Sequence, residues 1–134
     1  MSKKTKVNAA ILIIGNEILS GRTQDTNTVT LATWLNSIGV KVNEVRIIPD
    51  DEKIIVDTLN ILRKENSYVF TTGGIGPTHD DITASSVSKA FNLKYEIHKE
   101  AFKILEEYYQ PGEFNEGRQK MVWMPKNAEL IINP

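Results

Sequence analysis

Apolar residues recur along this chain in two alternating patterns, which predict strands and helices in turn. A run rich in β-branched residues at 7–14 is typical of a strand buried on both faces. From Asp25 the apolar residues follow helical spacing, so we expect a helix that Asp25 caps and Gly39 ends. The next expected elements are a strand at 40–48, a helix opened by the acidic residues 50–52, a strand at 68–72 and a helix led by residue 81 and ending near 91.

The last third of the chain has a more mixed pattern. It predicts a short strand at 93–97, a helix at 99–109, a loop at 112–117, a helical turn at 118–123 and a strand at 129–132. Trp34 and Phe91 lie on helical faces, and we expect them in the core. Strands that alternate with helices imply right-handed crossovers, so residues 1–134 are expected to form one domain, a three-layer α/β sandwich with a mostly parallel sheet.

Composition narrows the function classes. Sixteen Lys and Arg residues against seventeen Asp and Glu residues give a net charge of −1, which argues against a nucleic acid or an anionic membrane as partner. The chain has no cysteine, and this excludes disulfides, zinc–thiolate sites and thiol catalysis. Its longest apolar run, 9–14, is far shorter than the roughly 20 residues of a membrane span. We therefore expect a cytoplasmic protein.

Three unusual polar segments each follow a predicted strand directly, at 15–21, 50–51 and 73–81. In an open α/β sheet, ligands bind beyond the carboxyl ends of the strands. The predicted topology brings all three segments to that one edge, where we expect the ligand site.

The segment from Thr71 to Asp81 is the richest of the three, with the sequence TTGGIGPTHDD. Its glycines allow close approach to a ligand, its threonines supply hydroxyls, and the helix behind it presents free N–H groups, a combination that suits a phosphate. It is neither a Walker A loop nor the dinucleotide fingerprint, since His79 stands where the third glycine would be. The alternative is a strand-to-helix turn that needs glycine only for its backbone conformation.

Paired carboxylates on this edge suggest a metal. One of Asp80 and Asp81 is expected to cap the following helix while the other faces the loop. A carboxylate near a phosphate is tolerated when a divalent cation lies between them, and Mg²⁺ is the natural choice. Asp50 is either a cap or a second carboxylate that shares the metal or acts as a base.

Other polar residues near the edge have two interpretations each. Glu17, Asp25 and Asn27 flank the first loop and are candidates for holding a substrate, although Glu17 could be solvated and Asp25 only a cap. Arg118 and Lys120 are either solvated or neutralise phosphate, if their helical turn folds back over the cleft.

Several motifs together carry a family resemblance. They are GNEILxG at 15–21, DTN at 25–27, IPDD at 48–51, TTGGIGPTHDDIT at 71–83, RQKM at 118–121, Pro125 and the final NP. Through them residues 7–133 resemble the molybdopterin-binding domain that molybdopterin adenylyltransferases share with the competence/damage-inducible protein A (CinA) family. The glycine loop resembles the CinA branch.

The resemblance implies a three-layer α/β fold and a site on the predicted edge. It implies that Asp50 and Asp81 hold Mg²⁺ or another divalent cation and are catalytic, with Asp80 assisting. The substrate-binding residues it implies are Glu17, Asp25, Asn27, Thr72, Gly73, Gly74, Gly76, Pro77 and Thr78. In the family the chain continues past the last strand, so we expect the final elements of the domain to be missing here.

The implied activity is metal-assisted hydrolysis of an ADP-ribose-type nucleotide pyrophosphate. One alternative is molybdopterin binding with adenylyl transfer in molybdenum cofactor biosynthesis, where molybdopterin would be a ligand. Another is a non-catalytic module that binds a pterin or a nucleotide. The expected partners are thus a small nucleotide or pterin phosphate, and a further copy of the chain in a homo-oligomer.

Overall fold

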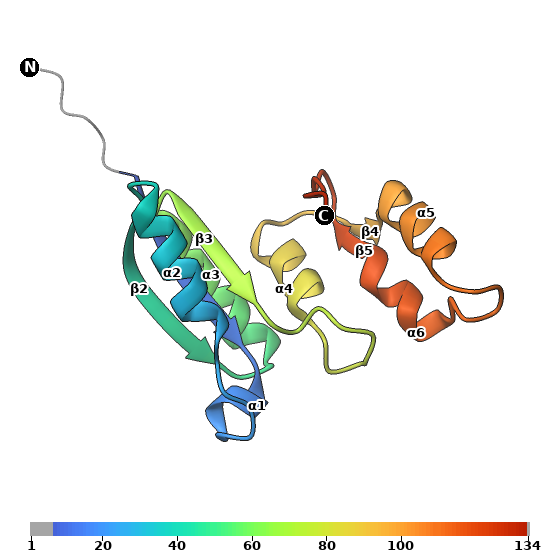
Figure 1. Ribbon diagram of the computed structural model, residues 1–134, viewed down its shortest axis with the longest axis horizontal. Helices are drawn as coiled ribbons and strands as arrows, with labels where there is room; N and C mark the ends of the chain where they lie inside the picture. Colours follow the sequence, from blue (N-terminus) through green and yellow to red (C-terminus); the bar gives the residue numbers. More distant parts are fainter. Residues whose placement is uncertain (1–6, 134) are drawn as a thin grey trace, which may run out of the picture.

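The computed structural model describes residues 7–133 (Figure 1). In chain order they form β1 (Asn8–Ile14), α1 (Asn16–Leu19), α2 (Asn27–Ser37), β2 (Lys41–Ile48), α3 (Glu52–Glu65), β3 (Tyr68–Thr72), α4 (Thr83–Ala90), β4 (Tyr95–Ile97), α5 (Lys99–Tyr108), α6 (Glu116–Gln119), the short 3-10 helix η1 (Lys120–Val122) and β5 (Trp123–Pro125). Of the helices among these residues, none is long and apolar enough to cross a membrane.

The first three strands form one parallel sheet in the order β2-β1-β3. The central strand β1 is the most buried because it has a neighbour on each side and a helix over each face. Its β-branched and leucine side chains make this possible, and the prediction of a strand buried on both faces is confirmed. The parallel register brings the carboxyl ends of all three strands to one edge.

Helices α2 and α3 cover opposite faces of the sheet and complete the three layers (Figure 1). On the α3 side, alternate residues of β1 such as Leu12 and Ile14 pack in one core cluster with Ile55, Leu59 and Leu62, whose spacing follows the helical period. The predicted three-layer α/β sandwich with a parallel sheet is therefore confirmed.

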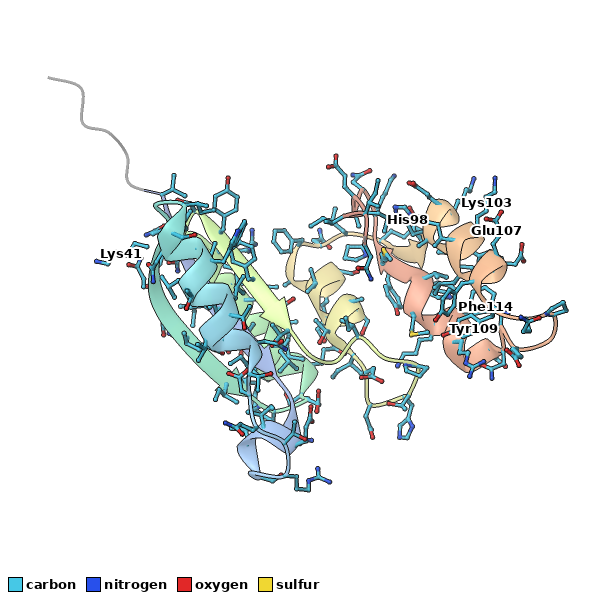
Figure 2. All side chains as sticks on the ribbon, in the orientation of Figure 1. Lys41, His98, Lys103, Glu107, Tyr109 and Phe114 are labelled. Atoms are coloured by element: carbon cyan, nitrogen blue, oxygen red, sulfur yellow. The ribbon has the colours of Figure 1, made fainter. Side chains whose placement is uncertain are left out.

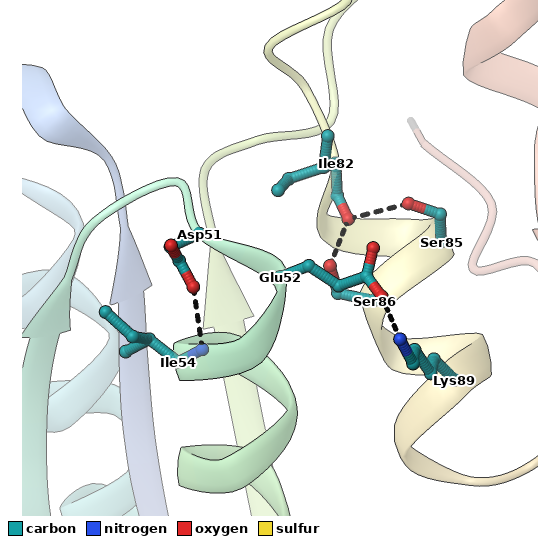
Figure 3. A network of polar contacts seen from close by, with 7 residues as sticks. All are labelled: Asp51, Glu52, Ile54, Ile82, Ser85, Ser86 and Lys89. Carbon is teal, nitrogen blue, oxygen red and sulfur yellow. Dashed lines mark hydrogen bonds and ion pairs between the residues drawn. The ribbon is translucent and has the colours of Figure 1, made fainter.

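Helix α4 packs beside α3 and joins the sheet to the rest of the chain. Figure 3 shows how the two helices are joined, because the Lys89 ammonium of α4 reaches the Glu52 carboxylate of α3. It also shows the start of α3, where the Asp51 carboxylate accepts from the backbone N–H of Ile54 at 3.0 Å. On its other side α4 contacts β4 and β5, which pair antiparallel as a separate two-stranded sheet.

The region from α5 to α6 is held together by aromatic contacts. The ring of Phe114 lies 5.1 Å from that of Phe102 and 5.9 Å from that of Tyr109, between the two helices (Figure 2). The Arg118 guanidinium lies 4.5 Å from the Tyr109 ring and donates to the backbone carbonyl of Glu113 at 2.8 Å. Arg118 therefore holds this loop in place.

One prediction about the last third of the chain is wrong. Residues 129–132 form no strand, because a strand needs a partner and this segment pairs with none of the described residues; Ile131 and Ile132 are 95% and 90% exposed. The helical turn predicted at 118–123 is confirmed over residues 118–122, in α6 and η1. Its last residue, Trp123, instead begins β5, where it pairs with Ile97 of β4.

Two aromatic residues expected in the core are largely exposed. Trp34 is 54% exposed, since the sheet-facing position on its turn of α2 is taken by the buried Leu35. Phe91, at the end of α4, is 43% exposed and is covered by the Arg63 guanidinium, 4.4 Å from its ring.

Candidate functional site at the carboxyl edge of the sheet

The three polar segments meet at the carboxyl edge as predicted. The first and second are joined directly: the N–H of Asn16 donates to the Asp50 carboxylate at 3.1 Å, and the N–H of Asp50 donates to the Asn16 side-chain carbonyl at 3.2 Å. Asp51 caps α3, which leaves the Asp50 carboxylate on the site edge. Sequence reasoning did not identify this role of Asn16, because residues 34 apart in the chain give no local signal of their contact.

Gly73 and Gly74 begin the glycine loop in left-handed conformations, with φ of 89° and 68°. A Cβ on Gly73 would lie 2.0 Å from the carbonyl oxygen of Ile14, so the loop passes directly over the end of β1. A Cβ on Gly74 would lie 2.2 Å from the Thr83 hydroxyl oxygen and 3.6 Å from a carboxylate oxygen of Asp50. The glycines are thus required for backbone conformation and close approach, and Asp50 borders the loop.

Asp81 borders the same loop farther along. Its carboxylate accepts from the N–H and the hydroxyl of Thr78, at 2.9 and 2.7 Å, and a Cβ on Gly76 would lie 2.8 Å from it. Partial burial raises the pKa of this carboxyl, but the hydrogen bonds from Thr78 and Gly76, together with the nearby charge of Lys120, outweigh it and lower the pKa. The charged form of Asp81 is therefore favoured.

The prediction that Asp80 or Asp81 caps the following helix is wrong. Helix α4 begins at Thr83, after Ile82, and no side chain caps it. Thr83 instead ties the helix to the loop, since its hydroxyl donates to the carbonyl of Gly73 at 2.8 Å and its N–H to that of Gly74 at 3.1 Å. Asp80 points to solvent, with its side chain 78% exposed and 3.2 Å from His79.

Five of the predicted substrate-binding residues line one pocket of about 230 Å³ between the first loop and the glycine loop. They are Glu17, Asp25, Asn27, Thr72 and Gly73. The N-cap of α2 is Thr26, one residue after the predicted Asp25. The Asp25 carboxylate still accepts from the backbone N–H groups of Asn27 and Thr28, at 3.1 and 3.3 Å, and so satisfies the first free N–H groups of the helix. We call this cavity the first-loop pocket.

Pro77 does not lie in the first-loop pocket, and it lines a different cavity on the other side of the glycine loop. The late helical turn does fold back as one interpretation required: the Lys120 ammonium donates to the backbone carbonyl of Thr78. Arg118, by contrast, is held by its own loop.

The site has few carboxylate side chains that could bind a metal ion. Within residues 7–133, no group of three or more His, Cys, Asp or Glu side chains is placed to hold an ion. Asp50 and Asp81 border the loop next to different glycines. A cation here would take at most these two carboxylates from the protein, together with water and substrate oxygens, which is the coordination Mg²⁺ adopts with phosphates.

A family model and several relatives match nearly the whole of this chain. A model described as "Probable molybdopterin binding domain" matches residues 10–130. A protein of Archaeoglobus fulgidus is 38% identical over 92% of this chain and 52% of its own length. A CinA-like protein of Citrifermentans bemidjiense is 36% identical over 96% of this chain and 31% of its own length. The chain thus spans about half or less of the length of these relatives.

Solved structures of CinA and molybdopterin biosynthesis proteins have a similar fold. CinA of Thermoplasma acidophilum superposes with a TM-score of 0.89 at 29% identity, over 97% of this chain and 78% of that one. The molybdopterin biosynthesis enzyme MoaB of Thermus thermophilus superposes with a TM-score of 0.61 over 86% of this chain and 71% of that one. Its identity of 19% supports the likeness of fold alone.

Proposed function

The chain belongs to the molybdopterin-binding domain family, in its CinA-like group, and from this premise we propose that it hydrolyses a nucleotide pyrophosphate of the ADP-ribose type with the help of a divalent cation. One observation carries the proposal: the carboxylate of Asp50, which follows β2, and that of Asp81, at the end of the glycine loop, lie beside glycines of the same loop. A loop whose N–H groups bind phosphate and whose borders carry carboxylates suits a phosphate ester with a bound cation.

Asp50 and Asp81 would hold Mg²⁺ in this proposal. Asp50 follows β2 and is fixed by its paired hydrogen bonds to Asn16, and the lowered pKa of Asp81 keeps it ionised at neutral pH. When bound, the cation would neutralise charge on the phosphate oxygens. Backbone N–H groups of 73–76 and the Thr78 segment would position the phosphates, and Thr72 and Asn27 would contact the substrate from the first-loop pocket.

Hydrolysis needs a base for the attacking water. The water oxygen would bond to one phosphorus while the bridging P–O bond breaks, giving AMP and ribose 5-phosphate. Of the carboxylates left for the proton, Glu17 is half-buried in the first-loop pocket, while Asp25 already accepts from two backbone N–H groups and Asp80 is exposed beside His79. We therefore assign the base to Glu17 and leave Asp80 an assisting electrostatic role.

The test is the turnover of ADP-ribose in Mg²⁺ by the 134-residue chain and by Asp81→Asn. We expect turnover by the parent chain and a loss of at least about 100-fold in the variant, the usual scale for a group that acts in the transition state. Asp57→Asn is the matched control, because Asp57 is an exposed carboxylate on α3 and, among residues 7–133, its ion-pair partner is Lys53 alone. Equal turnover by Asp81→Asn and the parent would sink the metal assignment.

A second candidate function is the binding of molybdopterin, with or without adenylyl transfer from ATP. The description of the matched family model favours it. Product formed from ATP and molybdopterin, without hydrolysis of ADP-ribose, would select the transfer reaction. Calorimetry that detects pterin or nucleotide binding without any turnover would select a non-catalytic binding module.

A further inference from the structure

A second and larger pocket lies on the other side of the glycine loop. Its volume is about 860 Å³, within the roughly 300–1,000 Å³ of small-molecule sites. Pro77 and Ile82 line it from the loop and the start of α4, Tyr95 from β4, and Trp123 from β5. We call it the hairpin pocket, because β4 and β5 form one wall.

The walls of the hairpin pocket are held by specific contacts. Residue pairing between β4 and β5 places Ile97 opposite Trp123, and the rings of Tyr95 and Trp123 lie 5.4 Å apart. Burial raises the pKa of Tyr95, which keeps its phenol neutral. Trp123 is 38% exposed, so part of its indole remains free to contact a ligand.

Polar groups lie at the same pocket in a pattern that suits a nitrogen heterocycle. Glu116 of α6 accepts hydrogen bonds, and Lys120 brings a positive charge. The Gln119 amide donates to the Phe114 carbonyl at 2.9 Å, and its carbonyl oxygen is an acceptor at the pocket. Proteins commonly bind flat ring ligands in pockets with an aromatic wall and a few polar groups. The aromatic side chains stack on the ring, and the polar groups form hydrogen bonds to the atoms at its edge.

The hairpin pocket is joined to the carboxylate site by two consecutive contacts. Lys120, which lines the pocket, donates to the carbonyl of Thr78, and Thr78 donates from its N–H and hydroxyl to Asp81. A molecule that lies in the pocket and carries a phosphate chain would therefore meet Lys120 and then the glycine loop.

From this arrangement we propose that the hairpin pocket binds the amino-bearing heteroaromatic ring of the substrate, stacked on Trp123, while its phosphates extend to the glycine loop. The proposal rests on the proposed function and adds to it the place of the ring. Adenine and a pterin share this ring chemistry, and the experiment below separates them.

The indole N–H resonances of the chain make a direct test. There are two tryptophans, so a ¹H–¹⁵N spectrum shows two indole signals, which Trp34→Phe assigns. Trp34 lies on α2, away from the hairpin pocket, and serves as an internal control. The probes are the methylene analogue of ADP-ribose, whose bridging carbon prevents hydrolysis, a pterin monophosphate and inorganic pyrophosphate, each with Mg²⁺.

We expect the analogue to shift the Trp123 signal and leave that of Trp34 in place, and pyrophosphate alone to shift neither. Trp123→Ala should weaken binding of the analogue about tenfold or more, the scale of a lost base–aromatic stack, while Trp34→Phe should not change it. The measurement on the parent chain stands even if Trp123→Ala folds poorly.

The other outcomes separate the two proposals. A shift of Trp123 by the pterin phosphate alone supports the pocket and selects the pterin. A shift of Trp123 without any hydrolysis of ADP-ribose supports the pocket and contradicts the proposed function. Hydrolysis with an unmoved Trp123 signal, or equal movement of both signals with pyrophosphate, overturns the pocket proposal.

Discussion

Asn16 and Asp50 hold each other in place through two reciprocal hydrogen bonds between the backbone N–H of each residue and the side chain of the other. Asn16 begins α1, one residue after the end of β1, and Asp50 follows β2, so the pair joins the two segments at the carboxyl edge. Because each side chain is held by a backbone group, the carboxylate of Asp50 has a fixed direction before any ligand arrives.

Replacing Asn16 with Ala should weaken Mg²⁺-dependent activity through Asp50. The variant loses the acceptor for the Asp50 N–H and frees the loop, and loss of a group that orients a ligand residue typically costs 10–100-fold in metal affinity or activity. A Mg²⁺ titration of ADP-ribose turnover measures the change. Asn43→Ala is the control, since Asn43 bonds only to Asn66 at 3.2 Å in the described contacts. An unchanged Mg²⁺ requirement in Asn16→Ala would show that Asp50 needs no such support.

Gly73→Ala should destabilise the fold more than Gly112→Ala does. Both glycines have positive φ, 89° and 84°, so both variants pay about 1–2 kcal/mol for a left-handed alanine. Only at Gly73 would the new Cβ meet a neighbour, the Ile14 carbonyl at 2.0 Å, whereas at Gly112 nothing lies within 4 Å. Urea unfolding should give an additional loss of about 1–3 kcal/mol for Gly73→Ala. Equal losses of unfolding free energy in the two variants would mean that the glycine loop does not lie in close contact with the end of β1.

The Asp81 carboxyl should make stability depend on acid pH. Its pKa is lower in the folded chain than its ordinary value of 3.8, so its contribution is fully present above that value and is lost as pH falls through the folded pKa. The difference in unfolding free energy between the parent and Asp81→Asn, measured in EDTA, should therefore be constant near neutral pH and shrink below about pH 4. A difference that grows towards acid pH would contradict the lowered pKa.

Alanine substitutions in α3 should lower the unfolding free energy strongly only on the face that packs against the sheet. Ile55→Ala removes a side chain with no exposed surface and should cost about 2–5 kcal/mol of unfolding free energy. Ile61→Ala on the same helix removes one that is 45% exposed and should cost much less. Similar losses in urea unfolding would contradict the packing of α3 on the sheet.

Much of this fold was predictable because its signals are local. The β-branched run of β1, the helical period of α3 and the acidic residues that open α3 each lie within a few residues, and each formed as expected. Strand β5 was not predictable in the same way: it has three residues, and only its pairing with β4 makes it a strand. The apolar segment 129–132 shows the converse, because high β propensity without a partner produced no strand.

In the candidate site, too, some residues were predictable from the sequence and others were not. The topology of parallel strands was enough to bring Glu17, Asp25, Asn27, Thr72 and Gly73 to one pocket. The hairpin pocket gave no such signal, since Pro77, Tyr95 and Trp123 are distant in the chain and none is chemically distinctive alone. The sequence did not predict the contact of Lys120 with Thr78 outright. It predicted only that Lys120 would reach the site if the late helical turn folded back over it, as the structure shows.

Lys120 and Arg118 make a matched pair for the last prediction. They lie two residues apart, yet Lys120 reaches the glycine loop at Thr78 while Arg118 lies over Tyr109 and donates to the Glu113 carbonyl. Lys120→Met should raise KM for ADP-ribose about tenfold, because a charge-assisted contact beside the phosphates is lost, and should raise the pKa of Asp81 by removing a nearby positive charge.

Arg118→Met should have the opposite profile. It removes a cation–π contact and a backbone hydrogen bond, so we expect a loss of about 1–2 kcal/mol of stability with KM unchanged. Steady-state kinetics with both variants, combined with a carboxyl ¹³C titration of Asp81, distinguishes the two roles. If Arg118→Met raised KM as much as Lys120→Met while the Asp81 titration stayed the same in both, the effect would come from general loosening of the α6 turn. The link from the hairpin pocket to the carboxylates through Thr78 would then have no functional meaning.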